Sequence, residues 1–269
     1  CNNSRQVIFK DESKVGDKAI PSPQVFPVYK RSDYDRIISQ MEYNKSMARP
    51  KQSSRSTNNL TYTIANAIVT GTGPRYFEFD IMLSQSDPSK YFSQGLARLQ
   101  YSSAAFGSNI VTNNKIVVTR GTVIADVTAY DNPTPADISA NEVAIPFVFQ
   151  VSNVNLYPLS SSPTDVVHVK MQLANCNTNS NVAFTSQTIM ELLSFYGTSS
   201  NDTFGQPYDA ISATQSVPVP ACRATITSFS PATINGGVNE LLTIKGFQFG
   251  TSGNVYFPNA DDGGSSKVA

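Results

Sequence analysis

The chain has 269 residues and a mass of 29.1 kDa, with 20 basic and 20 acidic residues and therefore no net charge. Charged residues make up only 15% of it, against roughly 25% in an average soluble protein, whereas serine, threonine and asparagine supply 77 residues. No apolar run reaches the ~18 residues of a membrane helix. The sequence has no strongly basic domain, so nucleic-acid binding is not expected. The single histidine, His168, excludes multi-histidine metal sites and histidine-based triads.

Cys1 begins the sequence without a methionine, which indicates a processed product or a fragment. One interpretation is the lipid-anchored cysteine of a bacterial lipoprotein, followed by a polar tether. The other is a chain numbered from an internal residue. Both interpretations predict a location outside the cytoplasm, either extracellular or at the cell surface.

Residues 1–56 are predicted to form an extended basic arm that contains one short helix. Residues 1–55 carry a net charge of +5 and the remainder −5, so the arm is expected to dock on the acidic remainder or on a neighbouring chain. Ser32 and Asp35 form a weak capping box at the start of the helix. Four apolar residues follow on one face at helical spacing: Tyr34, Ile37, Ile38 and Met41. This helix either covers a sheet edge or binds a partner.

Residues 57–200 alternate with a period of two, which is typical of β-strands. The predicted strands are Leu60–Val69, Tyr76–Leu83, Leu96–Tyr101, Lys115–Thr119, Val123–Tyr130, Val143–Val151 and Asp165–Leu173. Clusters of glycine, asparagine, proline and serine separate them, and short strands at such spacing predict an antiparallel sandwich. The segment Thr188–Tyr196 fits a helix equally well and stays undecided.

The remaining sequence is predicted to be a linker over 201–223, followed by a second β unit over 224–269. Cys176 and Cys222 lie in polar and proline-rich loop sequence. A disulfide between them would stabilise the fold by roughly 4 kcal/mol in the chain-entropy model. The alternative is two unrelated thiols, and a zinc site is not expected because neither cysteine belongs to a C-x-x-C pair.

A catalytic constellation is not found, and the chain is predicted not to be an enzyme. His168 lies on the polar side of an alternating strand, so we expect it to be solvated or hydrogen-bonded across strands. Two acidic loops are candidate calcium sites, because calcium prefers several oxygen ligands, although ordinary polar loops explain them as well. Their acidic residues are Asp131, Asp137 and Glu142 in one loop, and Asp261 and Asp262 in the other.

Sugar binding would require exposed aromatic residues. The chain has no tryptophan. Four strand tyrosines are expected to be core residues rather than a sugar platform: Tyr62, Tyr76, Tyr101 and Tyr130.

The tail Ile226-Thr-Ser-Phe-Ser-Pro231, followed by Gly236-Gly237 and by Leu242-Thr-Ile-Lys-Gly246-Phe-Gln-Phe-Gly250, resembles the start of an IPT/TIG domain. That family is an immunoglobulin-like sandwich, which needs ~7 strands and ~100 residues. The chain supplies about half of these, so the resemblance implies that the polypeptide continues or that another chain completes the fold.

The region 57–200 resembles the cohesin-like sandwich of secreted Bacteroidetes proteins. The resemblance rests on Tyr76–Leu83, on Leu96–Tyr101 with Ala105–Ile110, and on Lys115–Gly121. In such proteins these modules often precede a metallopeptidase-like domain and a type IX secretion signal, neither of which the chain contains.

The sequence therefore predicts an all-β chain in which a cohesin-like or immunoglobulin-like antiparallel sandwich precedes an incomplete second sandwich. We expect a non-enzymatic structural or adhesive module of a larger secreted or surface bacterial protein. Its partners are expected to be proteins, bound through the arm 1–55 or the C-terminal half-domain, and no cofactor other than calcium is considered. Two alternatives remain, the accessory region of a secreted metallopeptidase and a carbohydrate-binding module.

Overall fold

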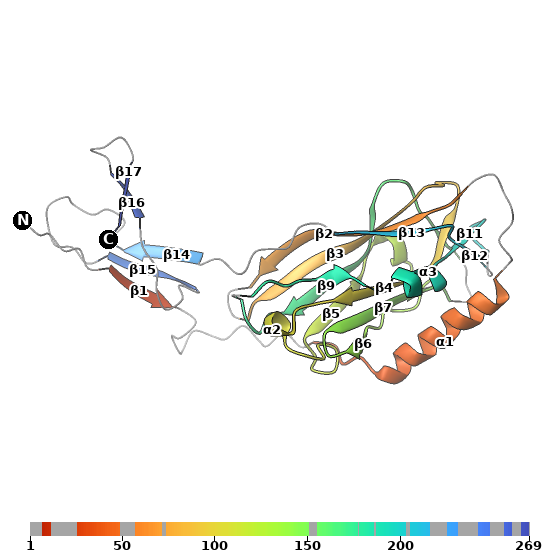
Figure 1. Ribbon diagram of the computed structural model, residues 1–269, viewed down its shortest axis with the longest axis horizontal. Helices are drawn as coiled ribbons and strands as arrows, with labels where there is room; N and C mark the ends of the chain where they lie inside the picture. Colours follow the sequence, from red (N-terminus) through yellow and green to blue (C-terminus); the bar gives the residue numbers. More distant parts are fainter. Residues whose placement is uncertain are drawn as a thin grey trace, which may run out of the picture. The chain divides into compact units, whose positions relative to one another are not determined.

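The computed structural model describes residues 7–11, 26–48, 57–71, 74–150, 155–176, 178–185, 187–202, 205–215, 225–230, 242–247, 256–259 and 265–268. They belong to two compact units. The larger unit is built from residues 25–221, and the smaller unit combines residues 1–24 with residues 222–269. The larger unit is a β-sandwich with a long helix on one side (Figure 1).

The first sheet of the sandwich has five strands in the order β13-β2-β3-β9-β5. The strands are β2 (Leu60–Thr70), β3 (Tyr76–Gln85), β5 (Ile116–Arg120), β9 (Thr164–Gln172) and β13 (Ile211–Gln215). Neighbouring strands pair antiparallel except β13 and β2, which are parallel. The predicted antiparallel character is therefore confirmed for most of this sheet.

The second sheet is centred on β4 and has the order β12-β11-β4-β7-β6. Two very short strands, β8 and β10, also pair with β4. The strands are β4 (Tyr91–Gln100), β6 (Ala136–Ser139), β7 (Glu142–Val148), β8 (Tyr157–Pro158), β10 (Ala183–Phe184), β11 (Phe195–Gly197) and β12 (Gln206–Pro207). All of the pairings in this sheet are antiparallel.

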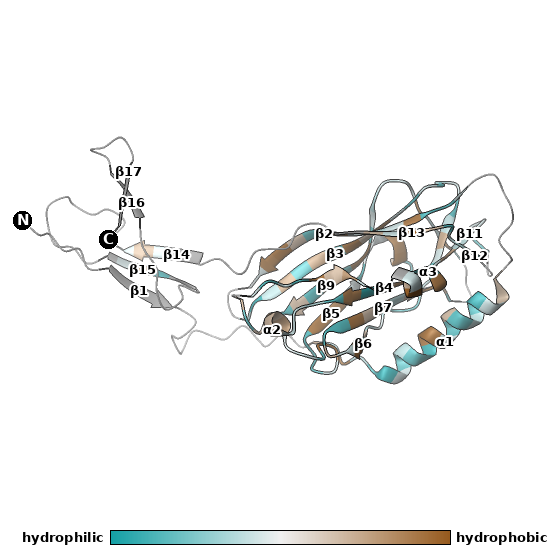
Figure 2. Cartoon of the chain, viewed as in Figure 1, coloured by the Kyte–Doolittle hydropathy of each residue, from teal (hydrophilic) through white to brown (hydrophobic). Residues whose placement is uncertain are grey.

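The main core lies between the two sheets. The alternation predicted for β3 is confirmed, because Phe77, Phe79, Ile81 and Leu83 are all buried. They pack in one cluster with side chains of the second sheet such as Phe147. Brown segments on the sandwich strands show this apolar pattern in Figure 2.

Helix α1 (Arg31–Met47) covers the outer face of the second sheet. The predicted apolar face is confirmed, since Tyr34, Ile37 and Met41 are buried and pack with Leu96, Ala144 and Val148. Strand β7 is accordingly apolar on both faces, because one face meets the core and the other meets α1.

The predicted capping box is wrong. The helix begins at Arg31, so Ser32 lies inside it, and the N-cap residue Lys30 makes no side-chain cap. Asp35 instead pairs with Arg31 one turn earlier, with 2.9 Å between Nε and Oδ1.

One predicted strand does not form. Residues 123–130 contain the short 3-10 helix η2 (Thr122–Ile124) and a turn in which Asp126 accepts bonds from Thr128 and Ala129. Val123, Ile124, Ala129 and Tyr130 are buried in the core, but the segment forms no strand and only Tyr130 makes an isolated bridge, to Phe149. Alternation alone therefore misled the prediction. A short helix, α2 (Ser103–Phe106), follows β4, and the undecided segment 188–196 divides into α3 (Gln187–Leu192) and β11.

The predicted linker 201–223 is wrong in its first half, because β12 and β13 both belong to the sandwich. Ile211 pairs with Leu60 and is buried, and Tyr208 packs in the core beside Tyr196. Too few apolar residues alternate in this stretch to show a strand pattern.

The smaller unit contains β1 (Val7–Asp11), β14 (Thr225–Ser230), β15 (Leu242–Phe247), β16 (Tyr256–Asn259) and β17 (Ser265–Val268). Strand β15 pairs antiparallel with β14 and parallel with β1, and β16 pairs with β17. The predicted arm is therefore not one segment. Its first part supplies a strand to the smaller unit, and its helix belongs to the sandwich. An IPT/TIG domain is not confirmed by these strands.

Candidate functional site

Charged side chains gather on the outer face of the first sheet, where β3 and β9 are neighbours. His168 bridges two acids, with 2.7 Å from Nδ1 to Oδ1 of Asp80 and 3.0 Å from Nε2 to Oε2 of Glu78. Lys170 Nζ lies 3.1 Å from Glu78 and 4.3 Å from the centre of the Tyr76 ring. The expectation of a cross-strand histidine is thus confirmed.

The two acids set the protonation of this cluster. Partial burial opposes the charged form of His168, but hydrogen bonds to Asp80 and Glu78 outweigh it and raise the histidine pKa. Burial likewise disfavours the Glu78 carboxylate, yet bonds from Thr70, Lys170 and His168 lower its pKa. The charges compensate one another, so the cluster stabilises a sheet surface and holds no unsatisfied catalytic group.

We expect His168 to make folding pH-dependent. Only imidazolium donates through both ring nitrogens, and a raised folded pKa means that the stabilisation is fully present below the unfolded pKa of about 6.5. The stabilisation is lost as pH rises through the folded pKa. The difference in unfolding free energy between wild type and His168→Gln should therefore shrink from pH 6 to pH 8. The effect is under about 1 kcal/mol because the side chain is 41% exposed. Urea unfolding at several pH values measures it, and a difference that grows with pH would contradict it.

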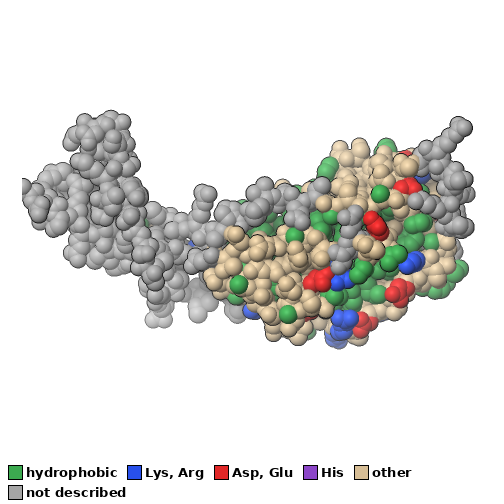
Figure 3. All heavy atoms as spheres, viewed as in Figure 1, with side chains coloured by type: hydrophobic (Ala, Val, Ile, Leu, Met, Phe, Trp, Pro, Cys, Tyr) green, Lys and Arg blue, Asp and Glu red, His purple; other side chains and the backbone are tan. Residues whose placement is uncertain are grey.

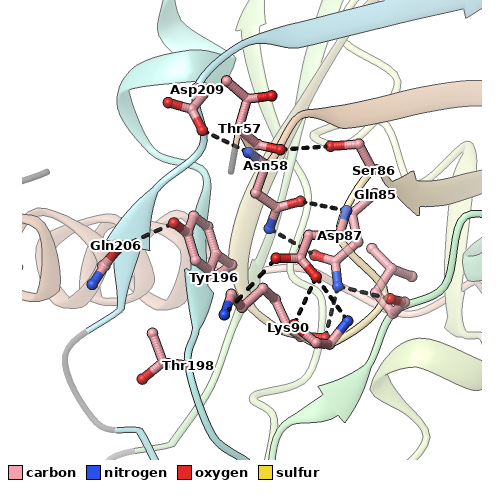
Figure 4. Close-up of polar contacts among 12 residues, drawn as sticks. Thr57, Asn58, Gln85, Ser86, Asp87, Lys90, Tyr196, Thr198, Gln206 and Asp209 are labelled. Atoms are coloured by element: carbon pink, nitrogen blue, oxygen red, sulfur yellow. Dashed lines mark hydrogen bonds and ion pairs between the residues drawn. The ribbon is translucent and has the colours of Figure 1, made fainter. Parts of the chain in front are cut away.

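A second polar cluster closes one end of the sandwich (Figure 4). Gln85 is its centre and is almost completely buried. Its amide nitrogen donates to the carbonyls of Lys90 and Leu159, both at 2.7 Å. Its amide oxygen accepts from Tyr208 at 3.0 Å and from Asn58 at 3.4 Å. All four hydrogen-bonding positions of this amide are therefore used within the protein.

The polar groups around Gln85 also form hydrogen bonds or ion pairs within the protein. Asn58 and Asp209 exchange two bonds, of 2.6 Å from the Asn58 amide to the carboxylate and 2.8 Å from the Asp209 amide to the Asn58 carbonyl. Asp87 accepts from Ser89 and pairs with Lys90. Tyr196 and Gln206 are joined at 3.1 Å. These hydrogen bonds connect the ends of the strands. The groups that make them are engaged within the protein, which leaves few of them to bind a substrate.

The three candidate calcium residues of the first loop each interact with a different part of the protein. Asp137 accepts bonds from the Val111 and Thr112 amides. Glu142 pairs with Arg98 at 2.7 Å, and Asp131 lies 3.3 Å from Arg36. Within the described ranges, no group of three or more histidine, cysteine or acidic side chains is arranged to hold a metal ion. The calcium prediction gains no support here, and Asp261 and Asp262 lie outside the described residues.

Of the two cysteines in the predicted disulfide, only Cys176 lies among the described residues. Cys176 takes part in a disulfide. Cys222 and Cys1 lie outside the described residues, so the Cys176–Cys222 pairing and the lipid anchor stay predictions.

The four strand tyrosines predicted to be core residues are all buried. Among the tyrosines whose side chains the structure describes, Tyr43 alone is exposed. Phe229 is also exposed, but it belongs to the smaller unit. The side chains described in either unit therefore include no group of exposed aromatic residues of the kind that binds sugars.

Exposed apolar side chains lie instead on helices α1 and α3, of which α1 packs on the second sheet and α3 contacts β4 and β13. They belong to Tyr43 and Met47 on α1, exposed by 52% and 45%, and to Ile189 and Leu192 on α3, exposed by 37% and 49%. We call these four residues the helical surface. Hydrophobic side chains on this side of the sandwich are visible around α3 and α1 in Figure 3.

Buried Gln94 brings the two helices of this surface together. Its amide oxygen accepts from Asn44 of α1 at 2.8 Å, and its nitrogen donates to the carbonyls of Met41 and Leu193 at 3.3 Å. The C-terminal half of α1 therefore meets the end of α3. The sequence pattern identified the inner face of α1 but not the helical surface. That surface depends on a contact between two segments that are distant in the sequence.

Comparisons with known proteins give structural similarity only. No family model and no curated protein matches the chain. The second type II cohesin module of the ScaA scaffoldin of Acetivibrio cellulolyticus is similar with a TM-score of 0.38 and 8% identity, over 64% of this chain and 100% of that one. The OlpC cohesin of Clostridium thermocellum, solved in complex with a dockerin, has a TM-score of 0.33 and 10% identity, over 74% and 100%.

A third cohesin, from an Acetivibrio cellulolyticus type II cohesin–X-dockerin complex, has a TM-score of 0.40 and 10% identity, over 60% of this chain and 98% of that one. Similarity at this level does not define a fold, and the sandwich is defined by its own strand pairing. None of the described helices is both long and apolar enough to cross a membrane.

Proposed function

We propose that this chain is a non-catalytic interaction module of a secreted or cell-surface protein, and that it assembles with other polypeptides. The helical surface is the observation that carries this proposal. Four large apolar side chains on α1 and α3 are exposed, and the two helices are linked through Gln94. Exposed apolar surface of this kind on soluble proteins marks interaction sites. The polar clusters described above are committed to internal bonds and supply no competing site.

The disulfide at Cys176 supports the proposed location. Disulfides form and persist in oxidising compartments, which include the periplasm and the cell exterior. The low charge content and abundant uncharged polar residues are compatible with the same setting.

The proposal is tested by charging the helical surface. We expect Met47→Glu with Leu192→Glu to weaken partner binding at least about tenfold, because a charge at a central apolar contact costs more than about 1.4 kcal/mol. The control is Val127→Glu, at an apolar residue that is 63% exposed in a turn. Sedimentation of source extracts should show wild type and control in an assembly heavier than the chain, and the double variant in lighter fractions. Identical sedimentation of all three proteins would contradict the proposal, provided that each melts like wild type.

A further inference from the structure

Strand β5 is an edge of the first sheet, and no strand among the described residues pairs with its other side. Its bonds to β9 fix its orientation. The Gln172 amide donates to the Lys115 carbonyl at 2.8 Å, and the Gly121 amide donates to the Val166 carbonyl at 2.9 Å. In an antiparallel ladder alternate residues face the partner. The backbone groups of Val118 therefore point away from β9, toward the open side.

The side chain of Tyr29 occupies this open side. The Val118 amide donates to the Tyr29 hydroxyl at 2.9 Å, and the hydroxyl lies 3.4 Å from the Val118 carbonyl oxygen. One hydroxyl thus takes both bonds that a neighbouring strand would make at Val118. The Tyr29 ring also packs against the main core, and burial raises its pKa, so the hydroxyl keeps its proton.

The sequence of β5 suits strand pairing. Residues 116–119 are Ile-Val-Val-Thr, four uncharged β-branched residues in a row, and such exposed edges pair readily with other chains. The other edges are less suitable. Strand β6 has four residues and a register shift, β12 has two residues, and β13 contacts β10 and α3.

We propose that the β5 edge is an association site for a second copy of this chain, and that Tyr29 keeps it closed. Two β5 strands would pair antiparallel about Val118, which places Val117 opposite Thr119 of the other copy. Both residues are β-branched, so the pair is self-complementary. This inference rests on the proposed assembly function and names one partner for it, at a surface distinct from the helical surface.

The first test is Tyr29→Phe, which retains the ring and removes the hydroxyl. We expect its self-association constant to rise at least about tenfold over wild type, because two bonds that compete with pairing are lost. Tyr91→Phe is the matched control, on a half-buried tyrosine of β4 that belongs to neither proposed surface, and it should behave like wild type. Adding Thr119→Lys, on an exposed edge residue, should reverse the association, because edge lysines oppose pairing. Sedimentation velocity over a concentration series gives the constants.

A Tyr29→Phe protein that folds and self-associates no more than wild type would overturn the proposal. If that variant does not fold, a peptide of sequence 115–121 replaces it as the probe. Excess peptide should slow amide exchange at 116–120 in wild type but not in Thr119→Lys, and equal exchange in both would overturn the proposal. These outcomes do not depend on Met47 or Leu192, so they are distinguishable from failure of the proposed function.

Discussion

Replacing Gln85 with methionine should lower the free energy of unfolding by about 4 kcal/mol, because each buried polar group left without its partner costs about 1–3 kcal/mol. The Lys90 and Leu159 carbonyls lose their donor, and Asn58 and Tyr208 lose their acceptor. Burial raises the pKa of Tyr208 well above its usual value. The hydroxyl therefore stays protonated and still requires a hydrogen-bond acceptor.

Chemical denaturation measures this loss. Gln100→Met is the matched control, because Gln100 ends β4 and is exposed. It should change stability by less than about 0.5 kcal/mol. A Gln85→Met protein as stable as this control would show that the polar cluster does not hold the strand ends together.

Replacing Gly95 with alanine should cost about 3 kcal/mol, at the upper end of the usual cost of overpacking. A Cβ at this position would overlap the Tyr62 hydroxyl and would lie 3.1 Å from the Phe92 ring. Tyr62 is fully buried and is held by Ser194 at 3.0 Å, so its ring has little freedom to move away.

A double-mutant cycle identifies the cause. Tyr62→Phe removes the overlapping oxygen, so Gly95→Ala should cost about 1–2 kcal/mol less in that background than in wild type. Thermal and urea unfolding of the four proteins measure the coupling. Additive effects would mean that the Tyr62 hydroxyl does not cause the destabilisation.

The fold was predictable wherever one face of a strand is apolar. Residues 76–83 and 165–173 alternate clearly and form β3 and β9. The prediction was wrong for residues 123–130, where Val123, Ile124 and Ala129 are buried outside any strand. Strand β13 was missed because its burial depends on parallel pairing with β2, about 150 positions earlier in the chain. Local alternation contains no information about such a partner.

The interaction features could be predicted only in part. The inner face of α1 and the position of His168 follow from periodicity. The roles of Tyr29 and Gln94 do not, because each bonds to residues at least 50 positions away. Their residue types are ordinary, and the chain fold alone brings them to an edge strand and to a helix junction.

Amide hydrogen exchange of the protein, alone and in the assembly isolated from its source, tests whether the helical surface binds a partner. We expect slower exchange in the assembly for residues 40–48 and 187–193, which contain the helical surface. Unchanged exchange in both segments, with protection confined to other parts of the sandwich, would contradict it.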